Sequence, residues 1–360
     1  MQTIPTPAMV IDGQGVTKNI ARMAEYTNSH GINLRPHIKT HKSKQFARMQ
    51  LQQGAIGLTV AKVGEAEIMS EVCDDILMAY PPVDSERSLR LAKLAGRINV
   101  RVGLDSSMAA EQLSAATTNL GTTVGVLVDY DVGYGRTGVQ SIRKSITLAQ
   151  IISQLKGLRL DGLMIYTGHV LGSEEKQRSH FSELQANCIQ LLEEWDKNGL
   201  AHEIVSSGST PSAYNSHFMP VVTEIRPGTY IFNDLNTAYG GYCELDDCVA
   251  RIQSTVISNT VAGQVVIDAG TKTLTSDLCG PRPDSGHGYI VEYPKARIAK
   301  LTEEHGQVDV SQCEKVPALG EQVTIIPNHI CVCMNMQNYV WWQEGASAEK
   351  VIVDARGMLI

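Results

Sequence analysis

The most constraining feature of this sequence is the regular alternation of two kinds of segment over residues 12–238. Short apolar runs rich in β-branched residues occur eight times, at residues 34–39, 55–60, 75–79, 99–104, 123–129, 160–167, 202–206 and 223–225. Between them lie segments with the apolar spacing of helices, for example at residues 16–29, 43–53, 62–72, 85–95, 141–155, 174–198 and briefly near Thr210. Because a parallel connection must be long enough for a helix, the alternation predicts parallel strands. The predicted fold is an α/β fold, a (β/α)8 barrel of the TIM type.

A different pattern follows this segment. Strand-like runs at residues 249–259, 264–269, 289–298, 322–326, 340–342 and 350–353 are joined by Gly, Pro and Asp turns, with hardly any helical spacing. This pattern indicates an all-β second domain. The opening segment 6–12 is also strand-like, and we expect it to pair with that domain. The predicted boundaries are residues 12–238 for the barrel and residues 1–11 with 239–360 for the β domain.

Composition and charge exclude several classes of protein. Of the 360 residues, 43% are hydrophobic and 19% are charged, which predicts a globular chain with a sizeable core. The formal charge of −7 gives no electrostatic reason to bind nucleic acid or an anionic membrane. No run approaches the roughly 20 apolar residues of a membrane span, and no secretory signal opens the sequence. We therefore expect a soluble, cytoplasmic protein with no nucleic-acid or membrane partner.

Unusual side chains are dense where the predicted strands end, at the face that carries the active site of a (β/α)8 barrel. They occur at residues 35–42, 129–138, 166–169, 206–210 and 226–230. The last two segments are rich in glycine and hydroxyl groups, which suits a phosphate held by backbone N–H groups. Each feature alone is more often a solvated charge or a helix N-cap. Together, a barrel lysine and a phosphate cup indicate a pyridoxal phosphate Schiff base.

Several motifs resemble those of fold-type III pyridoxal phosphate enzymes, within them the group of D-threonine aldolase and D-serine dehydratase. The matching segments are Thr6–Ala8, Arg35–Lys42, Ala61–Lys62 with Glu65–Glu67, Asp131–Val139, Ser207–Pro211, Arg226–Tyr230, Ile267–Gly270, Glu304–Gly306 and Pro327–Cys331. The resemblance spans nearly the whole chain. It implies an alanine racemase-like barrel, a C-terminal β domain, and a homodimer.

The resemblance also implies roles for individual residues. Lys39 matches the lysine that carries the Schiff base, and Arg136 matches an arginine near the cofactor's O3′. Tyr166 matches a tyrosine beside the pyridine ring. The phosphate-holding positions are matched by Gly208, Ser209, Thr210 and Tyr230, and the predicted cofactor-binding set also includes His37, Ser207 and Gly228.

A second cofactor, a divalent metal ion, is predicted near the C-terminus. The eight cysteines include no C-x₂-C pair, so we expect free thiols or metal ligands. His329 and Cys331 would lie on one face of an extended strand, because side chains there alternate. Imidazole and thiolate favour Zn²⁺ over Mn²⁺ or Mg²⁺, and the resemblance to a family metal strand supports the pair as ligands. Cys333 falls on the same face, and we expect it to be a bystander rather than a third ligand.

The implied substrate is a small D-3-hydroxy amino acid, such as D-serine, D-threonine or D-3-hydroxyaspartate. A metal-bound β-hydroxyl permits either its expulsion, which gives a 2-oxo acid and ammonia, or a retro-aldol cleavage to glycine and an aldehyde. Two departures from the aldolase pattern favour the dehydratase. The metal strand reads His-x-Cys rather than His-x-Asp, and Gly172 stands where aldolases place a base histidine. His169 is the candidate base nearby.

Two other classes of function stay open from the sequence. An amino-acid racemase needs a second base on the opposite cofactor face, such as Tyr289 of the β domain, and no metal. A non-enzymatic pyridoxal phosphate-binding protein fits a single barrel better than this longer chain with its metal pair.

Overall fold

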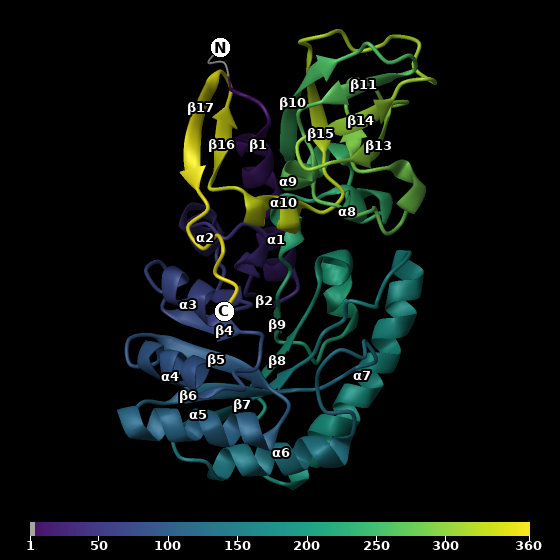
Figure 1. Cartoon of the computed structure of the whole chain (residues 1–360). Coiled ribbons are helices and arrows are strands. Elements are labelled where there is room, and N and C mark those ends of the chain that lie inside the picture. The colour runs from purple at the N-terminus through teal and green to yellow at the C-terminus, as the bar shows by residue number, and fades with distance from the viewer. Residues whose placement is uncertain (1–3) are drawn as a thin grey trace. The chain divides into compact units, whose positions relative to one another are not determined.

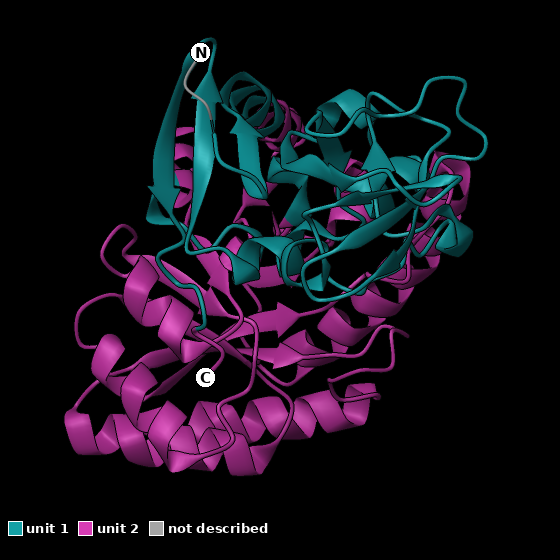
Figure 2. Ribbon diagram, turned by 45° about the horizontal axis from the view of Figure 1, so that its top comes forward, with its two compact units in different colours: residues 1–21, 40–45, 229–357 teal, residues 22–39, 46–228, 358–360 magenta. Residues whose placement is uncertain are grey.

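The computed structural model describes residues 4–360 and contains two compact units, which Figure 2 distinguishes by colour. The β-rich unit comprises the chain up to Ala21, Thr40–Gln45 and Thr229–Gly357. The barrel unit comprises Arg22–Lys39, Phe46–Gly228 and Met358–Ile360. The chain therefore passes between units at Lys39–Thr40 and at Gly228–Thr229, next to two of the predicted site segments. The boundaries 12–238 stay a prediction, and the division into compact units differs from them at these places.

The barrel unit is an eight-stranded parallel sheet in the order β2-β9-β8-β7-β6-β5-β4-β3 (Figure 1). Its strands are β2 (Asn33–Leu34), β3 (Leu58–Val60), β4 (Asp75–Met78), β5 (Asn99–Leu104), β6 (Val124–Asp129), β7 (Leu158–Met164), β8 (Ile204–Ser207) and β9 (Glu224–Ile225). A parallel bridge between His37 and Thr59 joins the chain after β2 to β3, which closes the barrel. The predicted fold class is thus confirmed. The predicted strand 34–39 is wrong in its second half, since the chain forms the 3₁₀ helix η1 (Ile38–Thr40) there.

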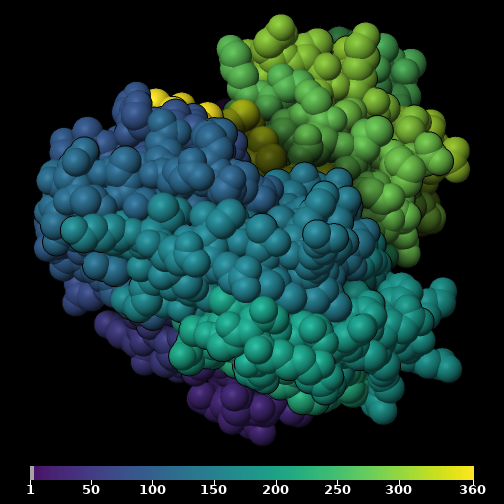
Figure 3. Space-filling model, turned by 90° about the horizontal axis from the view of Figure 1, so that it is seen from below, coloured from purple at the N-terminus to yellow at the C-terminus, as the bar shows by residue number. Residues whose placement is uncertain are grey.

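Helices connect successive strands, as parallel pairing requires. They are α2 (Lys44–Gln52), α3 (Val63–Met69), α4 (Ser85–Leu94), α5 (Ser107–Leu120), α6 (Ile142–Gln154), α7 (Glu174–Lys197) and the 3₁₀ helix η2 (Thr210–Phe218), while α1 (Gly13–Ser29) precedes β2. The side chains of Ser106 and Ser141 cap α5 and α6 by accepting from backbone N–H groups. Figure 3 shows the outer layer from α4 to α7 as a continuous blue-to-green surface. Within residues 4–360, no helix combines the length and the apolar character needed to cross a bilayer.

The β-rich unit is a nine-stranded sheet built around β10 (Ala250–Ser258). The opening strand β1 (Ala8–Asp12) pairs antiparallel with β10 and parallel with β16 (Tyr339–Glu344). The remaining strands are β11 (Gln264–Ile267), β12 (Tyr289–Ile290), β13 (Arg297–Leu301), β14 (Gly306–Asp309), β15 (Gln322–Ile326) and β17 (Ser347–Ile352). The long central strand carries the sheet because β1, β11 and β15 all pair with it.

The structure corrects two expectations for the β-rich unit. The predicted strand 289–298 is two strands, β12 and β13, with a turn that contains Pro294 between them. The unit also contains the short helices α8 (Leu235–Tyr239), α9 (Thr271–Leu274) and α10 (Ile330–Met336). Helix α10 matters most for function, because it contains one predicted metal ligand and is preceded by the other.

A chain of ionic hydrogen bonds runs through the barrel interior. The buried Arg35 guanidinium donates to the carboxylates of Glu224 and Asp75. Glu224 in turn accepts from the Ser206 hydroxyl at 2.6 Å, and Ser206 accepts from Arg226 at 2.6 Å. A buried charge is tolerated only when it is paired, so each member holds its neighbour in place. The chain of contacts fixes the ends of β2, β8 and β9 relative to one another.

We expect Glu224→Ala to lower the free energy of unfolding by about 3–5 kcal/mol, because it leaves the Arg35 charge buried and without its main partner. Equilibrium urea unfolding followed by circular dichroism measures the change. Glu86→Ala is the matched control, since Glu86 is 79% exposed and lies 3.9 Å from Arg90. This surface variant is expected to change stability by less than about 1 kcal/mol. Equal losses of unfolding free energy in the two variants would contradict a central role for the buried chain of ionic hydrogen bonds.

Candidate active site

Lys39 follows the first barrel strand, where the chain turns at the carboxyl end of the sheet. The His37 N–H donates to the Pro227 carbonyl at 3.0 Å, which ties the segments after β2 and β9 together. The Lys39 N–H points back to Nδ1 of His37 at 3.4 Å, and the Lys39 side chain is exposed. The amine is therefore accessible at the barrel face where the sequence predicts the cofactor.

The loop after β6 brings Arg136 onto two tyrosine rings. The Arg136 guanidinium carbon lies 4.4 Å from the ring centroid of Tyr166 and 5.2 Å from that of Tyr134. The two tyrosine rings meet edge to face with centroids 4.8 Å apart. Asp131 shapes the loop by accepting from the Gly133 and Gly135 N–H groups at 3.0 Å each. The structure thus brings Arg136 and Tyr166, which are far apart in sequence, into direct contact.

A backbone cup lies at the end of β8. Ser207 ends the strand, Gly208 has φ +112, and Ser209 precedes the helix η2 as its N-cap. The first N–H groups of a helix have no intrahelical acceptor, so those of η2 can bind an anion. A Cβ on Gly208 would lie 3.1 Å from the backbone nitrogen of Arg226, and only glycine adopts this φ freely. The cup fits a phosphate group.

Two members of the predicted phosphate set, Gly228 and Tyr230, lie in other segments than the cup at the end of β8. Gly228 is the last residue of the barrel unit before the chain leaves it. Tyr230 belongs to the β-rich unit, where it lies in the 3₁₀ helix η3 (Thr229–Ile231) with 2% of its surface exposed. Its phosphate-binding role stays a prediction.

Arg226 is a site residue that the sequence argument did not select. Its guanidinium donates to the Ser206 hydroxyl and to the Ile165 carbonyl. Burial lowers the pKa of Arg226 to about 10, against the opposing effect of the Glu224 and Asp129 carboxylates. The one sequence signal for Arg226 was its position directly after a predicted strand. Its side-chain partners, Ser206 and Ile165, come from segments distant in sequence.

His169 lies in the loop after β7, near the aromatic pair. Its ring centroid is 6.3 Å from that of Tyr134, and its Nδ1 is buried with no hydrogen-bond partner among the described residues. Burial and the nearby His180 lower the pKa of His169 below its ordinary value. The imidazole of His169 therefore takes up a proton less readily than an ordinary histidine.

His329 and Cys331 come together, but not on the extended strand that the sequence predicts. His329 is the N-cap of α10, and Cys331 is in the first turn of that helix. The expectation of strand alternation is wrong because the carboxylate of Asp234 accepts from the Ile330 N–H and starts a helix at this point. The extended backbone of the N-cap still allows the two side chains to hydrogen-bond each other.

The pair is held by groups that sequence reasoning missed. Asp277 Oδ2 lies 2.8 Å from His329 Nδ1, which leaves Nε2 available as a ligand. The Thr40 hydroxyl lies 3.2 Å from Cys331 Sγ. Burial disfavours the Cys331 thiolate, but the hydrogen bond and charge of His329 outweigh it and lower the pKa of Cys331. The Cys331 thiolate and Asp277 raise the pKa of His329 to about 9 despite its burial.

This donor set fits a divalent metal of the Zn²⁺ type. Imidazole and thiolate are its preferred ligands, and ligating histidines commonly hydrogen-bond a carboxylate through the other ring nitrogen. Within residues 4–360, no cluster of three or more His, Cys, Asp or Glu side chains has a metal-binding arrangement. Cys333 is buried and donates to the Leu274 carbonyl at 3.4 Å. Its expected position on the face of Cys331 is wrong, because residues two apart on a helix point in different directions.

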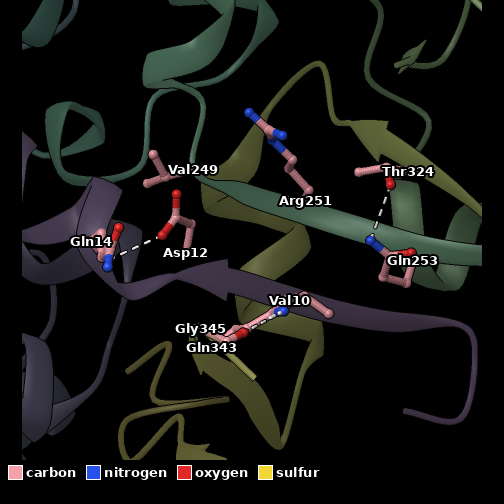
Figure 4. A pocket seen from close by; sticks show the side chains of 9 residues that line it. All are labelled: Val10, Asp12, Gln14, Val249, Arg251, Gln253, Thr324, Gln343 and Gly345. Carbon is pink, nitrogen blue, oxygen red and sulfur yellow. Dashed lines mark hydrogen bonds between the residues drawn. The ribbon is translucent and has the colours of Figure 1, made fainter. Parts of the chain in front are cut away.

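A polar groove of about 350 Å³ opens on the sheet of the β-rich unit, as Figure 4 shows. Its lining includes Asp12, Arg251 and Gln253, from β1 and β10. None of the predicted site residues lines it.

Two family models match the chain. The model described as the N-terminal domain of alanine racemase matches residues 11–235. The model described as a putative serine dehydratase domain matches residues 250–342.

Curated relatives span nearly the whole chain. D-threonine aldolase from Arthrobacter sp. is 30% identical, covering 98% of this chain and 93% of its own. D-threo-3-hydroxyaspartate dehydratase from Delftia sp. (strain HT23) is also 30% identical, covering 91% of each chain.

Solved structures agree with these matches. D-threonine aldolase from Filomicrobium marinum is 29% identical with a TM-score of 0.91, covering 99% of this chain and 97% of its own. A cysteine-to-alanine mutant of D-threo-3-hydroxyaspartate dehydratase, in a metal-free form, is 28% identical with a TM-score of 0.89, covering 97% of each chain.

We expect Cys331→Ser to return the pKa of His329 towards its ordinary value in chelator-treated protein, because the thiolate contributes most to the shift. Proton NMR titration of the imidazole measures it. A folded-state pKa raised above the unfolded value stabilises the fold fully below about pH 6.5. That stabilisation is lost as the pH rises through about 9. The lowered pKa of Cys331 contributes stability with the opposite pH dependence, so the imidazole titration itself, rather than the pH dependence of unfolding, is the readout. Cys333→Ser is the matched control. An equal change in the pKa of His329 in this variant would contradict the assignment of the shift to Cys331.

Proposed function

The chain belongs to the family of the alanine racemase N-terminal domain, and we propose that it is a pyridoxal phosphate- and metal-dependent lyase of D-3-hydroxy amino acids. The related enzymes are aldolases and dehydratases, so the chain is a carbon–carbon or carbon–oxygen lyase. We favour a dehydratase that converts D-serine, D-threonine or D-3-hydroxyaspartate to a 2-oxo acid and ammonia. The observation that carries this proposal is the thiol–imidazole pair of Cys331 and His329.

The barrel face provides the groups that would hold pyridoxal phosphate. Lys39 supplies the amine, the cup at Gly208, Ser209 and Thr210 supplies phosphate donors, and Arg136 over Tyr166 frames the ring. When bound, the cofactor supplies an electron sink for the bond broken at Cα. His37, Ser207, Gly228 and Tyr230 complete the proposed binding set.

His329 and Cys331 would hold the metal, with Zn²⁺ favoured over Mn²⁺ or Mg²⁺. A divalent cation there supplies Lewis acidity to the substrate's β-hydroxyl. The metal-free form of a related dehydratase implies that this relative binds a metal. Within the β-rich unit, the Thr40 hydroxyl contacts Cys331 Sγ.

Lys39 acts as the base in the proposed elimination. Its amine takes the proton from Cα of the D-amino acid, and the C–O bond at Cβ breaks with its electron pair leaving on oxygen. Water forms when the departing oxygen gains a proton. The resulting enamine becomes an imine and hydrolyses to a 2-oxo acid and ammonia, so substrate and products balance. Asp277 orients His329 and Asp234 orients the start of α10 throughout.

The second candidate is the aldolase, and one observation favours it. His169 lies near the aromatic pair and its pKa is lowered by burial, which suits a group that accepts the proton of the β-hydroxyl before Cα–Cβ breaks. Two observations favour the dehydratase instead. Gly172, at the position of the expected aldolase base, has φ +95, and the metal pair contains a thiolate. In the dehydratase reaction the accessible amine of Lys39 takes the proton from Cα, so no second base is needed.

We also propose a cytoplasmic homodimer. The eight cysteines are all free, as is typical of a reducing compartment. The dimer is inferred from the resemblance to fold-type III enzymes.

Proton NMR of the products from D-threonine, with purified protein, pyridoxal phosphate and Zn²⁺, is expected to show 2-oxobutanoate, with ammonia measured in parallel. D-Threonine permits either cleavage, so one substrate separates the candidates. Glycine with acetaldehyde would overturn the dehydratase in favour of the aldolase, without by itself identifying the base. The matched variant His169→Asn should keep dehydratase activity within about tenfold, whereas a general base contributes about 10²–10⁴-fold. Formation of L-allothreonine, the Cα epimer of D-threonine, would indicate a racemase.

Cys331→Ala is expected to lose the bound metal and the activity together, because one of two protein ligands is removed. Metal content by inductively coupled plasma mass spectrometry and the Zn²⁺ dissociation constant give the result independently of turnover. Cys333→Ala, two residues along the same helix, should retain both. Retention of metal by Cys331→Ala, or its loss from Cys333→Ala, would contradict the assignment.

A further inference from the structure

Two cysteines that the proposed reaction does not use contact each other in the β-rich unit. The thiols of Cys243 and Cys248 are hydrogen-bonded, on either side of the 3₁₀ helix η4 (Leu245–Asp247). Both belong to one small apolar cluster with Leu235 and Ile326. Two hydrogen-bonded thiols on either side of a three-residue helix are candidates for a disulfide, which joins cysteines whose Cα atoms lie within about 7 Å.

The two thiols differ in exposure and in acidity. Cys243 is half-buried, whereas Cys248 is fully buried. The hydrogen bond from Cys248 lowers the pKa of Cys243, and the same bond with burial raises the pKa of Cys248. Because the thiolate is the nucleophile, Cys243 is the thiol that reacts first and Cys248 the one that resolves the product.

Cys243 is connected to the metal pair by direct hydrogen bonds. Its S–H donates to the Thr237 hydroxyl oxygen at 3.6 Å, and the Thr237 hydroxyl donates to the Asp234 carbonyl at 2.7 Å. The Asp234 carboxylate accepts from Thr237 N–H with Oδ1 and from Ile330 N–H with Oδ2, each at 3.1 Å. Ile330 lies between His329 and Cys331, so three contacts lead from the dithiol to the ligands.

Helix α8 strengthens this connection. The Leu235 N–H donates to the Pro327 carbonyl at 3.1 Å, and the Asn236 side chain donates to the Asn328 carbonyl at 2.7 Å. The segment immediately before His329 is therefore attached to the helix on which Thr237 lies. A change in the cap of α8 is transmitted to both ends of the His329–Cys331 pair.

We propose that Cys243 and Cys248 form a reversible disulfide by exchange with a small-molecule disulfide. The Cys243 thiolate attacks one sulfur of the small disulfide, which releases one thiolate and leaves a mixed disulfide. Cys248 then loses its proton, attacks the Cys243 sulfur and releases the second thiolate. The protein pair loses two hydrogens, and the small disulfide is reduced to two thiols.

Oxidation would weaken metal binding, a consequence that rests on the proposed metal site. The Cys243 sulfur in a disulfide has no proton to donate, so Thr237 loses one of its hydrogen bonds. The S–S bond also draws Cys243 towards Cys248 and away from Thr237. Changes in contacts at this distance from a site typically alter its energetics by about 2- to 30-fold.

The first experiment titrates the full-length holoenzyme with glutathione disulfide and maps each cysteine by differential alkylation and mass spectrometry. We expect Cys243 and Cys248 to lose alkylation together, their shared peptide to lose two hydrogens, and dithiothreitol to reverse the change. Cys248→Ser should trap Cys243 as a mixed disulfide with glutathione. Cys313→Ser, which removes a partly exposed cysteine elsewhere in the unit, should behave as wild type.

The result that would overturn the proposal is specific. Cys243 and Cys248 would remain open to alkylation at glutathione disulfide concentrations that modify Cys313, or the wild type would accumulate the mixed disulfide as Cys248→Ser does. Cys331 and Cys333 are followed separately, because they lie on a different tryptic peptide.

The second experiment measures Zn²⁺ affinity by competition with a chromophoric chelator, for reduced and oxidised protein. We expect oxidation to raise the dissociation constant about 2- to 30-fold in the wild type and not at all in the double variant Cys243→Ser, Cys248→Ser. An unchanged constant in oxidised wild type would overturn the coupling. Failure of the reduced protein to bind Zn²⁺ would instead overturn the proposed metal site, while the alkylation map still decides the disulfide.

Discussion

Parallel strand pairing is the constraint on which the barrel and its site depend. Each parallel neighbour needs a helical crossover, so all eight strands run the same way and their carboxyl ends meet at one face. Residues as distant in sequence as Arg136 and Tyr166 are therefore in contact there. The buried chain from Arg35 through Glu224 and Ser206 to Arg226 then fixes the strands that support this face.

Asp234 has the corresponding role in the β-rich unit. Its buried carboxylate caps both α8 and α10, and burial raises its pKa even though backbone N–H groups favour the charged form. One side chain thereby sets the start of the helix that carries Cys331 and the cap that contacts Cys243. The metal pair and the dithiol share a support, so a chemical change at one site has a physical route to the other.

Family membership narrows the chemistry to a lyase, and the position of the proton acceptor decides which bond breaks. A base at Cα leads to loss of the β-hydroxyl, whereas a base at that hydroxyl leads to carbon–carbon cleavage. The proposal assigns the first reaction to Lys39 and makes His169, whose pKa is lowered by burial, the candidate for the second. Relatives of both kinds share about the same identity with this chain, so these two residues carry the distinction.

The sequence by itself determined the alternation that predicts eight parallel strands, and therefore the face on which Lys39, Arg136 and Ser207–Thr210 meet. Periodicity is local, so it can be read without the fold. It also selected His329 and Cys331, but on the wrong element, because the helix at α10 depends on a carboxylate about 100 residues away. Arg226, Asp277 and the Cys243–Cys248 contact were decided only by the tertiary structure. Their partners come from separate segments of the chain, and no local pattern records which distant side chain will lie within hydrogen-bonding distance.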